Sequence, residues 1–180
     1  VTNDRKLGRI YNMVQHPSIA PPFLDATTVV DSNATHGFLQ EAEVPAASGQ
    51  ATRWPQMKIN GKWIDLRHLH PVEKGETGHD VSSFVFDDRS GHGWVTAVHP
   101  GSRLLLGYVW KTRDYPWLNI WRYRRDGKVM ARGLEFGTTG LHQPFQELVA
   151  RGRILGRPLM SFIDAGKTVT REYLMVLMKV

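Results

Sequence analysis

The second half of the chain alternates apolar and polar residues with the period of two that is typical of β-strands. The segments with this pattern are rich in β-branched, aromatic and aliphatic residues, and turn-forming pairs such as Asp126-Gly127 separate them. They are residues 94–99, 103–111, 117–125, 128–135 and 171–180. One short helix is expected over Pro144 to Arg151. The pattern therefore predicts an all-β protein, an antiparallel β-sandwich or a barrel with long connections.

The first half is less regular. A partly alternating stretch from Gly8 to Gln15 indicates a half-buried strand, Asn60-Gly61 between two short apolar runs indicates a hairpin, and residues 82–87 indicate another short strand. Prolines at positions 17, 21 and 22 exclude both a helix and a central strand, so residues 16–24 are expected to form an extended, rigid loop. The Pro/Ala/Ser/Gly stretch at 45–49 is expected to be irregular.

Two ionisable residues stand where predicted strands end. Glu135 closes an apolar run before the glycine-rich loop 137–140, and His16 follows the end of the first predicted strand and begins the proline-rich loop. A histidine can hold or donate a proton near neutral pH, and a glutamate beside it can accept one, so the two residues are a candidate general acid and base. The alternative for Glu135 is an ion pair with Arg124 or Arg132 at a solvated strand end.

Other chemistry has weaker support in the sequence. His68-Leu69-His70, with His79-Asp80, could form the edge of a metal site, but no third ligand follows at a convincing spacing, and exposed loop histidines are the alternative. The serines lack a nucleophile-elbow context, and no glycine pattern matches a phosphate-binding loop. We therefore expect no metal site and no cofactor.

Aromatic residues cluster between positions 108 and 123. Flat rings beside hydrogen-bonding groups suit the C–H faces and hydroxyls of a sugar. Trp110, at a strand end before Lys111, is therefore a candidate for sugar binding or for the core, whereas Trp121 and Tyr123 are expected to fill the core.

Composition limits the number of domains and the classes of partner that the chain can have. The 180 residues are 41% hydrophobic, enough for one domain over residues 1–180. The net charge of +6 favours anionic ligands weakly, but the basic residues are scattered among acidic ones, so no nucleic-acid partner is expected. The chain has no cysteine, which excludes a disulfide scaffold, and it has no apolar run of membrane-spanning length, so no membrane partner is expected either. The compartment stays open, with the cytoplasm slightly favoured.

Four segments resemble the C-terminal part of aldose 1-epimerase (galactose mutarotase)-like proteins. They are residues 12–17 (NMVQHP), 107–112 (GYVWKT), 133–137 (GLEFG) and 163–171 (IDAGKTVTR). The resemblance spans essentially the whole chain and implies a large antiparallel β-sandwich, the galactose mutarotase-like supersandwich, that binds a sugar on one of its sheets. Because Val1 is not a methionine and family members have a further N-terminal part, the chain is expected to be the C-terminal part of a longer chain.

The resemblance also implies roles for particular residues. In the family, a histidine after a strand donates a proton to the ring oxygen, and a late glutamate removes the proton of the anomeric hydroxyl; these roles map onto His16 and Glu135. Asp80 loosely matches the aspartate that binds sugar hydroxyls. With Gln15, Trp110 and Lys111, it completes the predicted substrate-binding set.

The expected function is interconversion of the anomers of a monosaccharide or sugar phosphate by acid–base ring opening. The alternatives are a non-catalytic carbohydrate-binding module and an accessory β-domain of a larger glycoside-processing enzyme. The exposed sheet edges of such a fragment predict association, so a homo-oligomer is also an expected partner state.

Overall fold

The computed structural model describes residues 1–46 and 48–180, and it is built mainly from antiparallel strands. Residue 47, in the irregular stretch predicted at 45–49, lies outside the described residues. The strands are β1 (Arg9–Tyr11), β2 (Val14–Gln15), β3 (Ser18–Ile19), β4 (Val29–Ser32), β5 (Ala34–Leu39), β6 (Thr52–Arg53), β7 (Gln56–Ile59), β8 (Lys62–Asp65), β9 (Gly78–Phe86), β10 (His92–His99), β11 (Leu104–Lys111), β12 (Trp117–Arg125), β13 (Lys128–Gly137), β14 (Arg153–Ile154), β15 (Arg157–Pro158), β16 (Ser161–Ile163) and β17 (Tyr173–Lys179). The helices are α1 (Phe145–Arg151) and two 3₁₀ turns, Ser48–Gln50 and Pro100–Ser102.

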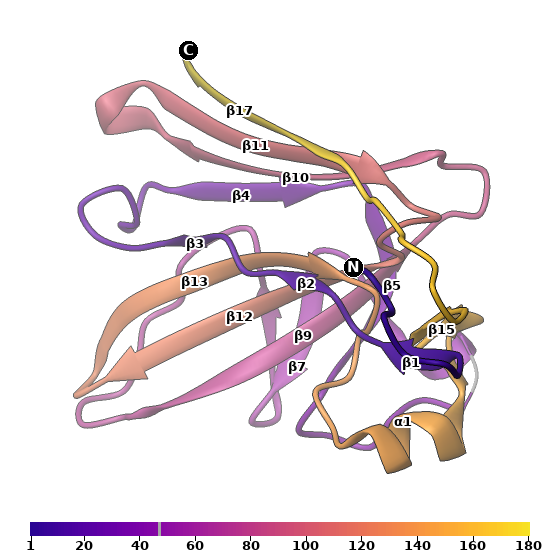
Figure 1. Ribbon diagram of the computed structural model, residues 1–180. Coiled ribbons are helices and arrows are strands. Elements are labelled where there is room, and N and C mark those ends of the chain that lie inside the picture. Colours follow the sequence, from indigo (N-terminus) through magenta and orange to yellow (C-terminus); the bar gives the residue numbers. More distant parts are fainter. Residues whose placement is uncertain (47) are drawn as a thin grey trace.

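Two sheets form the layers of a sandwich (Figure 1). The small sheet has four strands in the order β17-β11-β10-β4. The large sheet has seven, in the order β2-β13-β12-β9-β5-β6, with β3 also paired to β13. The predicted antiparallel β-sandwich is therefore confirmed, and so is the helix predicted over residues 144–151.

The two predicted hairpin turns are present and have the expected backbone. Asn60 and Gly61 have φ of 49° and 78° between β7 and β8, and Asp126 and Gly127 have φ of 50° and 74° between β12 and β13. Asparagine, aspartate and glycine tolerate this left-handed conformation, which matches the twist of the flanking strands. The Asp126-Gly127 turn thereby brings β12 and β13, of nine and ten residues, side by side in the large sheet.

Parts of the first half differ from the prediction. The strand predicted from Gly8 to Gln15 is two short strands, β1 and β2, that pair with different partners. β4 and β5 were not predicted, because their sequence alternates poorly. β5 pairs with β9 through an irregular register between Ala34 and Gly37. Gly37 lies directly against the Phe84 ring and the Ser83 backbone, and a Cβ there would meet both. Tertiary packing against β9, not local propensity, therefore makes this segment a strand.

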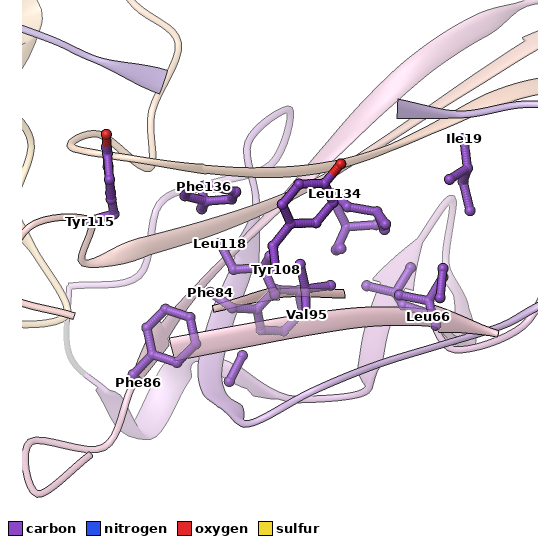
Figure 2. Packing of buried hydrophobic residues seen from close by; sticks show 14 of the residues in the cluster. Ile19, Leu66, Phe84, Phe86, Val95, Tyr108, Tyr115, Leu118, Leu134 and Phe136 are labelled. Atoms are coloured by element: carbon purple, nitrogen blue, oxygen red, sulfur yellow. The ribbon is translucent and has the colours of Figure 1, made fainter. Parts of the chain in front are cut away.

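The main core lies between the two sheets (Figure 2). Even-numbered residues of β9, β12 and β13, such as Leu118, Leu134 and Phe136, point inward and meet Val95 and Tyr108 from the small sheet. A second cluster packs α1 and β14 against the other face of the large sheet; it consists of Phe38, Val85, Trp117, Leu141, Leu148, Ile154 and Leu159. The part of the large sheet that contacts α1 and β14 is thus buried on both faces.

β17 forms an edge of the small sheet and is apolar on both faces. It pairs with β11, while Leu174, Met175, Leu177 and Met178 are each at least half exposed, at 59%, 58%, 62% and 50%. A strand that is apolar on both faces is typical of one covered on both sides. The predicted homo-oligomer stays a prediction, and this edge is where such association would begin. Among residues 1–46 and 48–180, no helix has the length and apolar character to cross a membrane.

Candidate functional site

His16 lies directly opposite Glu135 across two neighbouring strands. β2 pairs with the end of β13 (Gln15 with Phe136), and β3 pairs with its middle (Ser18 with Gly133), in one continuous register. Glu135, two residues before the end of β13, lies between these paired positions. Its Oε1 lies 3.0 Å from His16 Nδ1. The structure therefore brings together the two residues that the sequence singled out as acid and base.

Pro17 removes one backbone hydrogen bond from the strand pairing next to His16. Proline has no N–H, so it cannot donate to the ladder, and only its carbonyl takes part, accepting a bond from Leu134 N at 2.8 Å. A second clamp joins Met13 to Thr138: Met13 N donates to Thr138 Oγ1 at 2.9 Å, and Thr138 N donates to Met13 O at 3.0 Å. These bonds fix the backbone on both sides of His16 and leave its imidazole free to face outward.

The His16–Glu135 pair is asymmetric in exposure. The His16 side chain is 61% exposed, and that of Glu135 is 7% exposed. Glu135 Oε2 is buried and has no hydrogen-bond partner among residues 1–46 and 48–180. Buried polar atoms are nearly always paired, so a carboxylate oxygen in this state is available to accept a proton or a hydrogen bond from a ligand.

Asn119 and Ser83 continue the row across the large sheet beside Glu135. Each of the two is fully buried, and Ser83 Oγ donates to Asn119 Oδ1 at 2.8 Å. Gln40 Nε2 donates to Ser83 Oγ at 2.8 Å, while Asn119 Nδ2 donates to Thr139 O at 3.2 Å. Because the second core cluster surrounds them with apolar side chains, the buried polar groups of Ser83 and Asn119 would be costly without these hydrogen bonds. The network fixes the loop after β13 onto the sheet.

That loop carries a second histidine toward the site. His142 N donates to Gln40 Oε1 at 3.0 Å, and Gln40 Nε2 also donates to Gly140 O at 3.1 Å. Desolvation lowers the pKa of His142 below the ordinary histidine value. The charge of Glu135 acts to raise this pKa, and that of His16 acts to lower it. His142 is therefore within electrostatic reach of both members of the pair.

This arrangement predicts opposite pKa changes in two variants. In Glu135→Gln, the pKa of His142 should fall further, because the nearby negative charge is lost; in His16→Asn it should rise, because the nearby positive charge is lost. NMR titration of the His142 ring measures both. His92, an exposed residue at the start of β10 in the small sheet, serves as the control, and its pKa should not change. A His142 pKa that is unchanged in both variants would place this ring out of reach of the pair.

Trp121 and Tyr123 are not in the core, contrary to the prediction. Both side chains are half-buried, and their rings stack with centroids 5.7 Å apart and planes 5° apart. Trp121 is opposite Gly133, so it lies on the same face of the sheet as Glu135 and one row away. The outer face of the large sheet thus carries flat aromatic surface one row from Glu135.

The four residues predicted to hold the sugar lie elsewhere. Gln15 shares the inward face with its partner Phe136, and its Nε2 donates to Tyr115 Oη at 3.3 Å. Trp110 is 1% exposed and stacks on the Phe136 ring at 4.2 Å inside the main core. Lys111 is exposed at the end of β11, in the other sheet. The structure does not bring these side chains to Glu135, because strand alternation points them to other surfaces.

Asp80 also points inward, where it serves a charge cluster. Arg122 Nε and Nη2 donate to its two oxygens at 2.9 and 2.8 Å, and Arg124 Nη1 donates to Oδ2. The Asp80 side chain is 6% exposed. Its position on the inward face, with both oxygens engaged by arginines, places it away from the outer face that carries Glu135.

The histidines considered for metal binding do not converge. His70 Nε2 bonds to Asp65 O at 2.7 Å, and within residues 1–46 and 48–180 no three histidine, cysteine, aspartate or glutamate side chains are grouped to hold a metal ion.

Comparison with known proteins finds likeness in fold. No protein-family model and no curated protein matches the sequence. A structure from Klebsiella pneumoniae, assigned provisionally as an aldose 1-epimerase, matches with a TM-score of 0.62 and 12% identity over 98% of this chain. A galactose mutarotase related enzyme from Lactobacillus acidophilus matches with a TM-score of 0.59 and 13% identity over 99% of this chain. The chain has the galactose mutarotase-like fold.

The match covers only part of these two proteins. This chain spans 39% of the Klebsiella protein and 54% of the Lactobacillus protein. The resemblance in sequence is therefore confirmed at the level of fold, and within the galactose mutarotase-like fold the His16–Glu135 pair occupies the outer face of the large sheet.

Proposed function

We propose that this chain binds a monosaccharide over the His16–Glu135 pair and interconverts its anomers. The observation that carries the proposal is the 3.0 Å contact between His16 Nδ1 and Glu135 Oε1, on the outer face of the large sheet of a galactose mutarotase-like fold, where the His16 side chain is 61% exposed. The anomeric hydroxyl and the ring oxygen of an aldose are attached to the same carbon. A base and an acid that lie side by side are therefore matched to these two oxygens.

The proposed reaction uses Glu135 as the base and His16 as the acid. Glu135 takes the proton of the anomeric hydroxyl, the oxygen's electrons form the C1=O1 bond, and the C1–O5 bond breaks as protonated His16 gives its proton to O5. Rotation about C1–C2 then presents the other face of the aldehyde. Ring closure reverses each proton transfer, so Glu135 and His16 return to their starting states and no co-reactant is consumed.

Trp121 is the residue best placed to hold the ring. Its half-buried indole lies on the face that carries Glu135, one row along the sheet, and Tyr123 stacks behind it. An indole face packs well against the C–H face of a pyranose, which supplies apolar contact without competing for the hydroxyl groups.

A second candidate is sugar binding without turnover, as a binding module or an accessory domain of a larger glycoside-processing enzyme. This chain spans only 39% and 54% of the two similar structures, which is compatible with a domain that binds sugar while the rest of a larger enzyme catalyses a reaction. The fold hosts a site without fixing its chemistry. The exposed face around His16 would serve this role equally well.

Polarimetry and calorimetry on the same preparation separate the two candidates. With α-glucose or α-galactose, we expect mutarotation faster than in buffer alone. Glucose 6-phosphate as a competitor tests the preference for an anionic sugar. Calorimetric sugar binding with no rate enhancement would favour the binding module, and neither binding nor turnover with any of these sugars would reject the proposed sugar site.

Gly133 gives a sharp test of how Glu135 is positioned. A Cβ at position 133 would lie 3.0 Å from Glu135 Oε1 and 3.0 Å from Trp121 Cβ, so the carboxylate must move. Small displacements of a catalytic group cost on the order of 10²-fold in rate, and we expect a loss of about that size in kcat for Gly133→Ala.

Gly107→Ala is the matched control. Gly107 is also a strand glycine, but a Cβ there meets its nearest atoms at 3.5 Å, an ordinary contact. Its rate should equal that of the wild type. Wild-type activity in Gly133→Ala, with Glu135 shifted in its structure, would mean that this carboxylate does not take part in the reaction.

A further inference from the structure

Arg132 is a buried cation that forms no ion pair with any carboxylate in the described part of the chain. Its side chain lies on the inward face of β13 and is 1% exposed. Nη2 donates to His68 O at 2.9 Å, but Nε and Nη1 have no hydrogen-bond partner among residues 1–46 and 48–180. Burial, together with the nearby charge of Arg122, lowers the pKa of Arg132 to about 10. A guanidinium in this state is costly unless an acceptor is supplied.

The carboxylates around Arg132 are each taken by another cation. The pairs are Asp80 with Arg122 at 2.8 Å, Asp65 with Arg67 at 2.6 Å, Glu76 with Arg124 at 2.7 Å and Glu73 with Lys62 at 3.4 Å. Arg132 is therefore the surplus positive charge of this cluster. The compensating group has to come from outside these pairs.

A cavity of about 550 Å³ lies against this cluster. Its charged lining consists of Arg122, Arg124 and Arg132 on β12 and β13, together with Lys62, Glu73 and Glu76, where Glu73 pairs with Lys62 and Glu76 with Arg124. Its apolar wall is formed by the β7–β8 hairpin and the segment after it, through Ile59, Ile64, Leu69, Pro71 and Val72. The cavity thus offers positive charge on one side and hydrocarbon contact on the other, within one enclosure of ligand size.

We propose that this cavity binds a small organic anion, with its carboxylate or phosphate group toward Arg132 and its apolar body against the β7–β8 hairpin. The anion supplies the charge that Arg132 lacks, and the apolar wall selects against a bare inorganic ion. Arg122 and Arg132 pair in register on the inward face of the large sheet, whereas Glu135 faces outward. The proposed site is therefore separate from the sugar site and does not depend on it.

The test is a titration of the full chain with sodium hexanoate, with hexyl phosphate in parallel and hexanamide as the uncharged analogue. NMR of the arginine Nε–H groups reports contact directly in the wild type, and calorimetry gives affinity. We expect hexanoate or hexyl phosphate to shift the Arg132 Nε–H resonance, hexanamide to leave it unchanged, and the stronger of the two anions to identify the head group. In Arg132→Met we expect affinity to fall at least about tenfold, as for loss of a charged hydrogen bond.

Arg113→Met is the control. It removes an exposed arginine that follows β11 and does not line the cavity, so this variant should bind as the wild type does. Equal binding of hexanamide, unchanged affinity in Arg132→Met, or no shift of Arg132 with either anion would each overturn the proposal. The NMR arm needs only the wild type, so it decides the question even if the variant does not fold.

Discussion

Glu135→Gln should lower kcat for α-glucose mutarotation by about 10²–10⁴, the usual range for loss of a general base. The amide keeps the size of the side chain and can still bond to His16, but it cannot take the proton of the anomeric hydroxyl. Stability should change little, because the partner imidazole is 61% exposed and water screens its charge. Polarimetric rates and a thermal melt of the same sample measure the two effects.

Glu147→Gln is the matched control for this variant. Glu147 is exposed in the first turn of α1, so the same chemical change there should leave the rate at the wild-type value. If Glu135→Gln turned over α-glucose as fast as Glu147→Gln, Glu135 would not be the base.

Asp80→Asn should destabilise the protein by about 3–5 kcal/mol, the cost of leaving buried cations without their partner. The Asp80 and Arg122 side chains are 6% and 10% exposed, and Arg124 bonds to the same carboxylate. With Arg132 already unpaired, the loss of this one negative charge leaves a group of buried guanidiniums to repel one another. Urea unfolding of the variant and the wild type measures the difference in the free energy of unfolding.

Asp88→Asn provides the comparison. Asp88 also pairs with an arginine, Arg157, but its side chain is 88% exposed, so the loss should stay below about 1 kcal/mol. A role in holding sugar, as the sequence suggested for Asp80, would instead weaken sugar affinity and leave unfolding unchanged. That result would return Asp80 to the substrate-binding set.

Much of the fold follows from local signals in the sequence. The two turn dipeptides fix hairpins because their residues tolerate a left-handed backbone, and alternation marks the long strands around them. His16 and Glu135 each stand out locally, because a proline follows the histidine and a glycine-rich loop follows the glutamate; what brings them together is the pairing of β2 and β3 with β13, far away in the sequence. Both residues could be found because each stands at a break in a regular pattern.

The residues around the pair could not be found in the same way. Counting back from the Asp126-Gly127 turn, Trp121 would lie opposite Arg132 and share its inward face. A bulge at Tyr123 and Arg124 shifts the register by one residue, and Trp121 instead lies opposite Gly133 on the outer face. No residue in this stretch marks the bulge, so the assignment of Trp121 and Tyr123 to the core was wrong.

The position of Trp110 in the core could not be predicted from its own segment either. Its place at a strand end before Lys111 is compatible with either surface, and its burial depends on Phe136, which stacks on it from the other sheet. His142 was overlooked because its distance from Glu135 depends on a loop that Gln40, far away in the sequence, fixes in place. Contacts between distant segments decide both cases, and neither segment carries that information alone.

The central claim is that His16 and Glu135 act as one acid–base unit on the anomeric centre of a sugar. The most direct measurement is the polarimetric rate of the His16→Asn/Glu135→Gln double variant beside both single variants. If the two residues work in one step, the double variant should be no slower than the slower single variant, because removing either already disables the unit. Rate losses that multiply in the double variant, or single variants as fast as the wild type, would contradict the account.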